Sequence, residues 1–276
     1  MRTLSPARSC SRRFALLAPR EGGAPAYFSR VTEDQGRYHR LLSDVQKMRG
    51  RIYLSDGAIT PAELTADGRH QLREDQSSWH LLLLDQESEV VGCMRYLLHQ
   101  NTVPISTLNA FSSALGQCDR WGGHLKKALR SELHRARKEN VGFAEIGGWA
   151  LDERCRCSAE ALRVVLATYG LAQLLGDALG VSTATTRNGS AKILRRLGGQ
   201  SVISSGVELP PYFDPTYRCD MELLRFDSRS PNERYSPWVE ELHYDLLTAP
   251  VIYATRPSTV GNIFTFEPMN DLAQRA

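Results

Sequence analysis

The sequence predicts a single domain of the α/β or α+β class, with a mixed central sheet flanked by helices. Strand-like and helix-like segments alternate in a mixed order along the chain, which is typical of strands and helices that share one core. The 276 residues are 42% hydrophobic and 24% charged, so the chain is long and apolar enough to bury that core.

The first 26 residues are expected to form a disordered basic arm. Residues 1–20 hold five arginines and no acid, and the apolar run F-A-L-L-A is shorter than the core of a signal sequence. A transit peptide is the alternative for this composition. The main domain is expected over 27–227, and 228–276 is expected to be a C-terminal extension with a helix at 237–247.

The formal net charge of +3 is a local effect of this arm, since the rest of the chain is close to neutral. The remaining basic residues gather on one helix without interleaved aromatic residues, which argues against a nucleic-acid role. No apolar run reaches the ~18 residues of a membrane span. Six cysteines without a regular spacing favour a reducing, cytoplasmic compartment.

The first regular elements are a helix and a hairpin. Apolar residues at helical spacing predict a helix around 38–48, and a loop-rich stretch follows. The runs 80–85 and 90–99 flank a short polar turn and predict an antiparallel hairpin. Arg95 is a charge inside the second of these strands. It either reaches solvent along its own stem or faces a substrate.

Residues 119–138 are expected to form an amphipathic helix, because apolar residues recur at steps of three and four. Its outer face carries seven basic side chains against one acid, Glu132. Such a face is either simply solvated or a docking surface for an acidic partner.

The segment 143–151 reads as a strand with one carboxylate, Glu145. Burial raises the basicity of a carboxylate, so Glu145 is a candidate general base; the alternative is a structural carboxylate bonded to a loop or to Arg95. Gly147 and Gly148 indicate a β-bulge or packing against a bulky neighbour. A bulge would turn the amide of Trp149 or Ala150 outward, where it can polarise a thioester carbonyl.

The loop R-C-R-C-S-A at 154–159 leads into a second amphipathic helix. Ser158 suits an N-cap, and Arg154 and Arg156 add positive charge where helix amides are free, so this turn is a candidate phosphate site. Cys155 and Cys157 form a C-x-C pair, but no second ligand pair accompanies them, so no metal site is expected.

A strand at 181–186, the motif N-G-S-A-K-I-L-R-R-L-G-G at 188–199 and a closing strand at 218–227 complete the pattern. In this order the segments resemble the core of the GCN5-related N-acetyltransferase (GNAT) superfamily, and especially its N-acyl amino acid synthases and acyl-homoserine-lactone synthases. The likeness spans about residues 30 to 227. The loop at 154–159 lacks the glycines of the usual superfamily loop.

The resemblance implies an N-acyltransferase that uses acyl-CoA or acyl carrier protein (ACP) as its thioester donor and a small-molecule amine, such as an amino acid, as acceptor. The acyl group is expected to be long, and to enter between the strands 143–151 and 181–186. An acidic ACP would dock on the basic helix 120–138. The implied catalytic residues are Glu145, Trp149 and Arg95. The implied carrier-binding residues are Leu151, Arg154, Arg156, Cys157, Ser158, Ala159 and Asn188. Asp75, Trp79, Gly147 and Gly148 are expected to shape the substrate pockets.

Two other functions fit the same residues. One is an acetyl-CoA-dependent N-acetyltransferase of a small amine or a protein. The other is a catalytically silent member of the fold that binds an acyl ligand or a partner.

Overall fold

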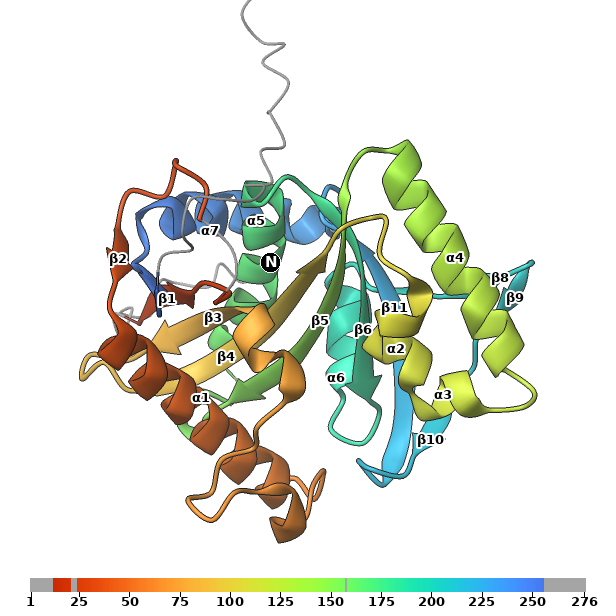
Figure 1. Ribbon diagram of the computed structural model, residues 1–276, viewed down its shortest axis with the longest axis horizontal. Helices are drawn as coiled ribbons and strands as arrows, with labels where there is room; N and C mark the ends of the chain where they lie inside the picture. Colours follow the sequence, from red (N-terminus) through yellow and green to blue (C-terminus); the bar gives the residue numbers. More distant parts are fainter. Residues whose placement is uncertain (1–11, 21–23, 157, 256–276) are drawn as a thin grey trace, which may run out of the picture.

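A mixed sheet of ten strands organises the chain (Figure 1). The computed structural model describes residues 12–20, 24–156 and 158–255. Neighbouring strands follow the order β10-β11-β6-β5-β4-β3-β1-β12-β2, and β7 pairs with β11. The strands are β1 (Arg13–Leu17), β2 (Val31–Glu33), β3 (Trp79–Leu84), β4 (Val90–His99), β5 (Gly142–Leu151), β6 (Ala178–Thr185), β7 (Gln200–Ser201), β10 (Tyr212–Asp214), β11 (Cys219–Asp227) and β12 (Val251–Tyr253). A separate hairpin joins β8 (Ile203–Ser204) to β9 (Val207–Glu208).

Helices cover both faces of this sheet. They are α1 (Gln35–Ser55), α2 (Asn109–Ser112), α3 (Ala114–Gln117), α4 (Gly122–Lys138), α5 (Glu160–Leu174), α6 (Ser190–Arg196) and α7 (Ser236–Thr248). Short 3₁₀ turns lie at Pro61–Glu63, Arg73–Ser77, Ile105–Thr107, Glu153–Cys155 and Glu233–Tyr235. Within the described ranges, no helix combines the length and apolarity that a bilayer span requires.

Alternation along the strands decides which helix lies on which face. Met94 and Tyr96 of β4 point into the core that contains α5 and α7, whereas Cys93 points into the core beneath α1. The third core lies on the same face as α1, but beneath α4 and over β6 and β11. The face shared by α1 and α4 is therefore covered at its two ends by two separate cores, and α1 and α4 lie on opposite sides of β4 and β5 (Figure 1).

Most elements expected from the sequence are present. β3 and β4 form the hairpin, α4 occupies most of the basic segment, and β5, α5, β6 and α6 follow in the expected order. β5 and β6 are parallel, so they need a crossover, and α5 supplies it. The helix expected to begin at Ser158 begins at Glu160.

The prediction of a disordered arm over 1–26 is wrong at residues 13–17. Arg13–Leu17 forms β1, which lies inside the sheet, antiparallel to β3 and parallel to β12. The physical reason is the apolar run that looked like a weak signal sequence, because Phe14, Leu16 and Leu17 are at most 5% exposed. Residues 1–11 lie outside the described residues.

The boundary expected at 227/228 is also wrong as a domain limit. α7 packs against α5, and β12 is an internal strand between β1 and β2. The segment expected as an appended extension completes the sheet instead. Residues 256–276 are outside the described part of the chain.

Candidate active site

A cavity of about 1250 Å³, here called the main cavity, opens on the face shared by α1 and α4. It lies where β5 and β6 separate. These parallel strands pair from Gly142↔Ala178 to Ile146↔Ser182 and then diverge. The end of α1, the segment of α2 and α3, the start of α5 and the start of α6 surround the opening. This volume is ample for a drug-sized ligand.

The expected β-bulge is present at the floor of the main cavity. Between the pairs Cys93↔Ala150 and Arg95↔Gly147, β5 has two residues opposite one residue of β4. Gly148 has φ +65°, and a Cβ at this position would lie 3.1 Å from the Cβ of Arg95, so glycine is required. The bulge displaces the backbone of Trp149, whose carbonyl accepts a hydrogen bond from the Tyr53 hydroxyl at 3.3 Å.

Glu145 precedes Gly148 of this bulge by three residues, lines the main cavity and is 5% exposed. Its carboxylate accepts hydrogen bonds from the backbone N–H of Asn109 at 3.0 Å and of Ala110 at 2.8 Å. The Asn109 side-chain amide also donates to it, and His99 Nε2 lies 3.1 Å away. An ionised carboxylate offers enough lone pairs for all these groups. Glu145 thus fixes the start of α2 and also faces the cavity, so the structural role is observed and the role of general base stays a prediction.

Arg95 is held inside the sheet rather than reaching solvent. Its side chain is largely buried and donates to Glu74 at 3.0 Å, so the expected alternative pair with Glu145 does not form. Arg95 and Glu74 both line the main cavity beside Gly147. The Nε atom of Arg95 is buried without a partner among the described residues, which leaves it able to bind a further acceptor.

Two residues expected in the substrate pockets lie elsewhere. Asp75 is 1% exposed and binds the buried Arg49 through two hydrogen bonds, of 3.0 Å and 2.7 Å. Burial alone would raise the pKa of Asp75, but the hydrogen bonds and charge of Arg49 outweigh it and lower this pKa to about 2. Trp79 packs against Phe28 in the core on the α5 face. Neither Asp75 nor Trp79 lines the main cavity.

The loop before α5 divides its two arginines between different tasks. Arg154 turns away from the main cavity to Asp152, Asp85 and Glu89. Arg156 lines the cavity and forms two hydrogen bonds to Asp56, at 2.9 Å and 3.0 Å. Of these two arginines, only Arg156 is therefore placed to meet a phosphate inside the main cavity.

The other carrier-binding candidates are also split. Leu151, Ser158 and Asn188 line the main cavity, whereas Ala159 is only the cap residue before α5. The Ser158 hydroxyl accepts a hydrogen bond from the Glu160 backbone N–H at 3.2 Å and donates one to the Cys155 carbonyl at 2.6 Å, but the N-cap position expected for Ser158 belongs to Ala159. Cys157 lies outside the described residues.

Several cavity residues were missed from the sequence. Asp56 ends α1, and Tyr53 and Tyr217 approach each other from opposite sides with ring centroids 6.4 Å apart. Arg187 donates to the carbonyls of Asp56 and Gly57 and, with its other nitrogen, to those of Tyr217 and Arg218. The signal that pointed to them was weak, because these side chains meet only through the tertiary fold.

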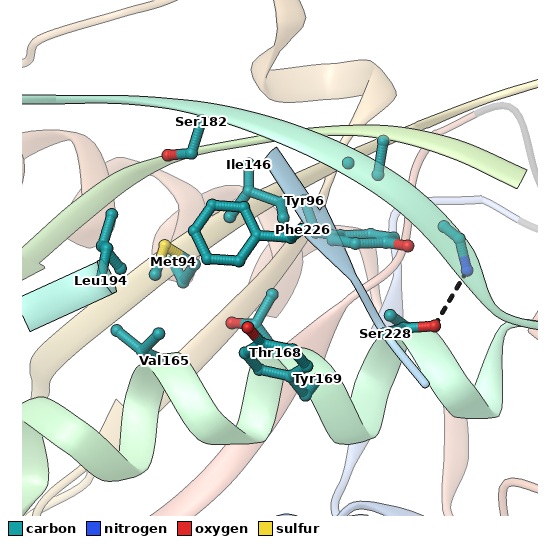
Figure 2. Close-up of a pocket in the computed structure, with 14 residues that line it drawn as sticks. Met94, Tyr96, Ile146, Val165, Thr168, Tyr169, Ser182, Leu194, Phe226 and Ser228 are labelled. Atoms are coloured by element: carbon teal, nitrogen blue, oxygen red, sulfur yellow. Dashed lines mark hydrogen bonds between the residues drawn. The ribbon is translucent and has the colours of Figure 1, made fainter. Parts of the chain in front are cut away.

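A second, smaller cavity of about 30 Å³, here called the side cavity, lies on the opposite face of the sheet, between the strands and α5 (Figure 2). Met94, Ile146, Ser182 and Leu194 line both cavities, so the two meet where β5 and β6 separate. The remaining lining is mostly apolar, with Val165 and Phe226 among its side chains (Figure 2). An apolar chain that enters between the strands would point toward this space.

The architecture matches solved structures, while comparisons with family models and with curated proteins find no match. The chain is similar to a CoA-dependent acyl-homoserine lactone synthase, BjaI, solved with SAM and isopentyl-CoA. The identity is 15%, with 87% of this chain and 92% of that chain covered, and the TM-score is 0.52. The chain has the GNAT-type fold. The resemblance recognised in the sequence is thereby confirmed at the level of the fold.

Two further solved structures match this chain with lower TM-scores. One is FeeM, an N-acyl amino acid synthase from uncultured soil microbes, at 14% identity, with 67% of this chain and 84% of that chain covered and a TM-score of 0.45. The other is a putative N-acetyltransferase from Lactobacillus plantarum, at 10% identity, with 78% and 97% covered and a TM-score of 0.41.

Proposed function

We propose that the protein is an N-acyltransferase that moves an acyl group from a thioester carrier, acyl-CoA or acyl-ACP, to the amine of an amino acid or a related small molecule. One observation carries this proposal. A buried carboxylate, a glycine bulge and the separation of two parallel strands all border the same cavity. The CoA-dependent acyl-homoserine lactone synthase that this chain matches has the same fold, which supports this class.

The reaction divides among groups of the cavity. Glu145 takes a proton from the acceptor ammonium group, directly or through a water molecule, and the resulting amine nitrogen attacks the thioester carbonyl carbon. The backbone amide of Trp149 or Ala150 at the bulge stabilises the negative oxygen of the tetrahedral intermediate. The carbon–sulfur bond then breaks, and the leaving carrier thiolate takes up the second proton that the nitrogen loses as the amide forms.

The donor is held by the segment that leads into α5. Arg156, Ser158 and the free amides of the first helical turn bind its phosphate groups, since a helix N-terminus favours anions. Leu151 at the end of β5 and Asn188 in the turn after β6 contact the pantetheine arm. Arg95 is proposed to bind the carboxylate of an amino-acid acceptor, because its side chain lines the cavity.

The acyl group is proposed to enter between β5 and β6 and to place its tip in the side cavity. The side cavity, with a volume of about 30 Å³, admits only one or two water-sized groups. A long acyl chain therefore requires the lining side chains to move. This small volume favours a second candidate, an acetyl-CoA-dependent N-acetyltransferase, whose two-carbon acyl group needs no such movement.

The decisive experiment combines a donor panel with Glu145→Gln. Thiol release and acylated product are measured for acetyl-CoA, medium-chain and long-chain acyl-CoA with each amino acid. We expect acyl transfer to an amino acid, and a loss of at least about a hundredfold in kcat for Glu145→Gln with acyl-CoA binding retained. Glu132→Gln is the matched control, since Glu132 is also buried and hydrogen-bonded but lies on α4 outside the cavity.

Unchanged turnover in Glu145→Gln would assign Glu145 a structural role only. Turnover of acetyl-CoA alone would favour the second candidate. No turnover with any donor would instead indicate a silent member of the fold.

If the donor is acyl-ACP, we propose that it docks on α4. Arg135 is paired with Glu132, Glu139 and Asp227, whereas Lys127, Arg130 and Lys138 are exposed and form no ion pair within the part of the chain that the structure describes. ACP is acidic, so these three charges suit it. Seven basic residues were expected on this helix, and ion pairs remove Arg135 from the set available to a partner.

Charge reversal at Lys127, Arg130 and Lys138 tests this dock. We expect the triple variant to raise the KM for acyl-ACP about tenfold and to leave the KM for acyl-CoA unchanged, because only the protein carrier touches this surface. Equal effects on both donors, or none on acyl-ACP, would contradict the proposal.

A further inference from the structure

The side cavity has a polar end, and its chemistry narrows the acyl group. This inference rests on the proposed function, because it concerns the part of the donor that passes between β5 and β6. Where it meets the main cavity, the side cavity is mostly apolar, with Met94, Ile146 and Leu194 beside the hydroxyl-bearing Ser182. At the opposite end lie Tyr96 and Ser228, and the Tyr96 hydroxyl points toward Ser228 (Figure 2).

Tyr96 is 1% exposed, and its hydroxyl has no hydrogen-bond partner among the described residues. Burial raises the pKa of Tyr96 well above its usual range, so the phenol keeps its proton and is a hydrogen-bond donor. Buried polar groups are almost always satisfied, because an unsatisfied one costs about 1–3 kcal/mol. The Tyr96 hydroxyl is therefore free to donate to a molecule in the side cavity.

The neighbouring polar groups are already committed. The Ser228 hydroxyl donates to Asp177 Oδ1 at 2.6 Å and accepts from the Ala178 backbone N–H at 3.1 Å. The Thr168 hydroxyl donates to the Val164 carbonyl at 3.0 Å. The Tyr169 hydroxyl also lacks a partner, but it lies against Gly198, since a Cβ built there would be 2.6 Å from it. Tyr96 is thus the group that offers an unused donor at the far end.

We propose that the side cavity selects an acyl group that carries an oxygen, as a hydroxyl or a carbonyl, at its far end, and that the Tyr96 hydroxyl donates a hydrogen bond to this oxygen. The apolar walls accept the hydrocarbon part of the acyl group, and the polar end accepts its tip. A charged carboxylate tip is disfavoured, because no cationic side chain lines the side cavity.

The test compares ω-hydroxyacyl-CoA thioesters with unsubstituted acyl-CoA thioesters over a series of matched chain lengths. Binding is measured by isothermal titration calorimetry, which needs no knowledge of the acceptor. We expect the hydroxyacyl donor to bind about tenfold more tightly at the length that reaches Tyr96. Tyr96→Phe should abolish this difference and leave the affinity for the unsubstituted donor equal or higher.

Tyr38→Phe is the matched control, since Tyr38 is equally buried and its hydroxyl is unpartnered among the described residues, but it belongs to α1 on the other face of the sheet. It should keep the preference. If neither kind of donor binds, the proposed function fails. If both bind equally at every length, or if the preference survives in Tyr96→Phe, the proposed function stands and this inference is overturned, with Tyr96 holding only a water molecule.

Discussion

Arg49 is fully buried although it carries a charge, and it lies beside the bulge. Its guanidinium would lie 3.4 Å from a Cβ at Gly148, on the side of the sheet that α1 covers. Asp75 holds it with two hydrogen bonds, and the His70 carbonyl accepts another. The pair therefore packs beside the bulge, and Asp75 contacts Arg49 rather than the main cavity.

Asp75→Asn should be strongly destabilising. Removing one partner leaves the charge of Arg49 uncompensated in the interior, which costs about 3–5 kcal/mol. Urea unfolding monitored by circular dichroism measures the change in the free energy of unfolding. Asp67→Asn removes an equal charge from an exposed loop and should change stability little. A loss below about 1 kcal/mol in Asp75→Asn would contradict the importance of the pair.

The same residue predicts an acid sensitivity. The pKa of Asp75 is lowered from 3.8 to about 2, so its stabilising effect is complete above pH 3.8 and is lost as the pH falls through 2. Over that window the wild-type protein should lose roughly 2 kcal/mol more than Asp75→Asn. If the stability of the two proteins instead changed with pH in parallel, Arg49 would not be what holds Asp75 ionised.

At the scale of elements, the end of α1 closes over the main cavity. Asp56 receives Arg156 from the start of α5, and Arg187 ties the carbonyls of Asp56 and Gly57 to those of Tyr217 and Arg218. The arginine proposed to bind the donor phosphate is therefore already occupied by a carboxylate. The donor must compete with Asp56 for Arg156.

Asp56→Asn should tighten donor binding, because the neutral amide competes less well for the guanidinium and no longer repels phosphate. We expect the Kd for CoA to fall several-fold in a titration at low ionic strength, and the gain to shrink in high salt. Asp67→Asn controls for the change in net charge. A weaker or unchanged affinity would mean that Asp56 assists phosphate binding or that Arg156 does not contact it.

At the scale of the whole molecule, the sheet joins both ends of the described chain. β1 lies between β3 and β12, with Leu16 opposite Leu81 on one side and Val251 on the other. α7 packs against α5, and both helices belong to one core. Because these segments contribute to one core, the chain should unfold as one unit.

A fragment of residues 27–227 tests this directly. It lacks β1, α7 and β12, so it exposes apolar surface of β3 and α5, and we expect no cooperative unfolding transition by circular dichroism. In the full chain, Leu16→Ala should lower stability by about 2–5 kcal/mol, while Ile203→Ala, at an exposed position, should have little effect. A cooperatively folded fragment would restore the boundaries expected from the sequence.

Local patterns predicted what depends on neighbours in sequence. Alternation identified β4 and β5, helical spacing identified α1 and α4, and the glycine pair identified the bulge. Partners distant in sequence could not be predicted. Asp75 pairs with Arg49 of α1, and Arg156 pairs with Asp56 at the end of α1. Each pair forms only because the order of strands in the sheet brings its two residues together. β1 was missed because a five-residue strand after an arginine-rich segment has no period long enough to recognise.

The parallel pairing of β1 with β12 also constrains how the protein is made. During synthesis β1 leaves the ribosome early, and it can pair with β3 as soon as that strand has also emerged. Its other edge stays open until residue 251 emerges, because Leu16 awaits Val251 there. Over that interval the nascent chain exposes an apolar strand edge, the kind of surface that recruits chaperones or a second chain.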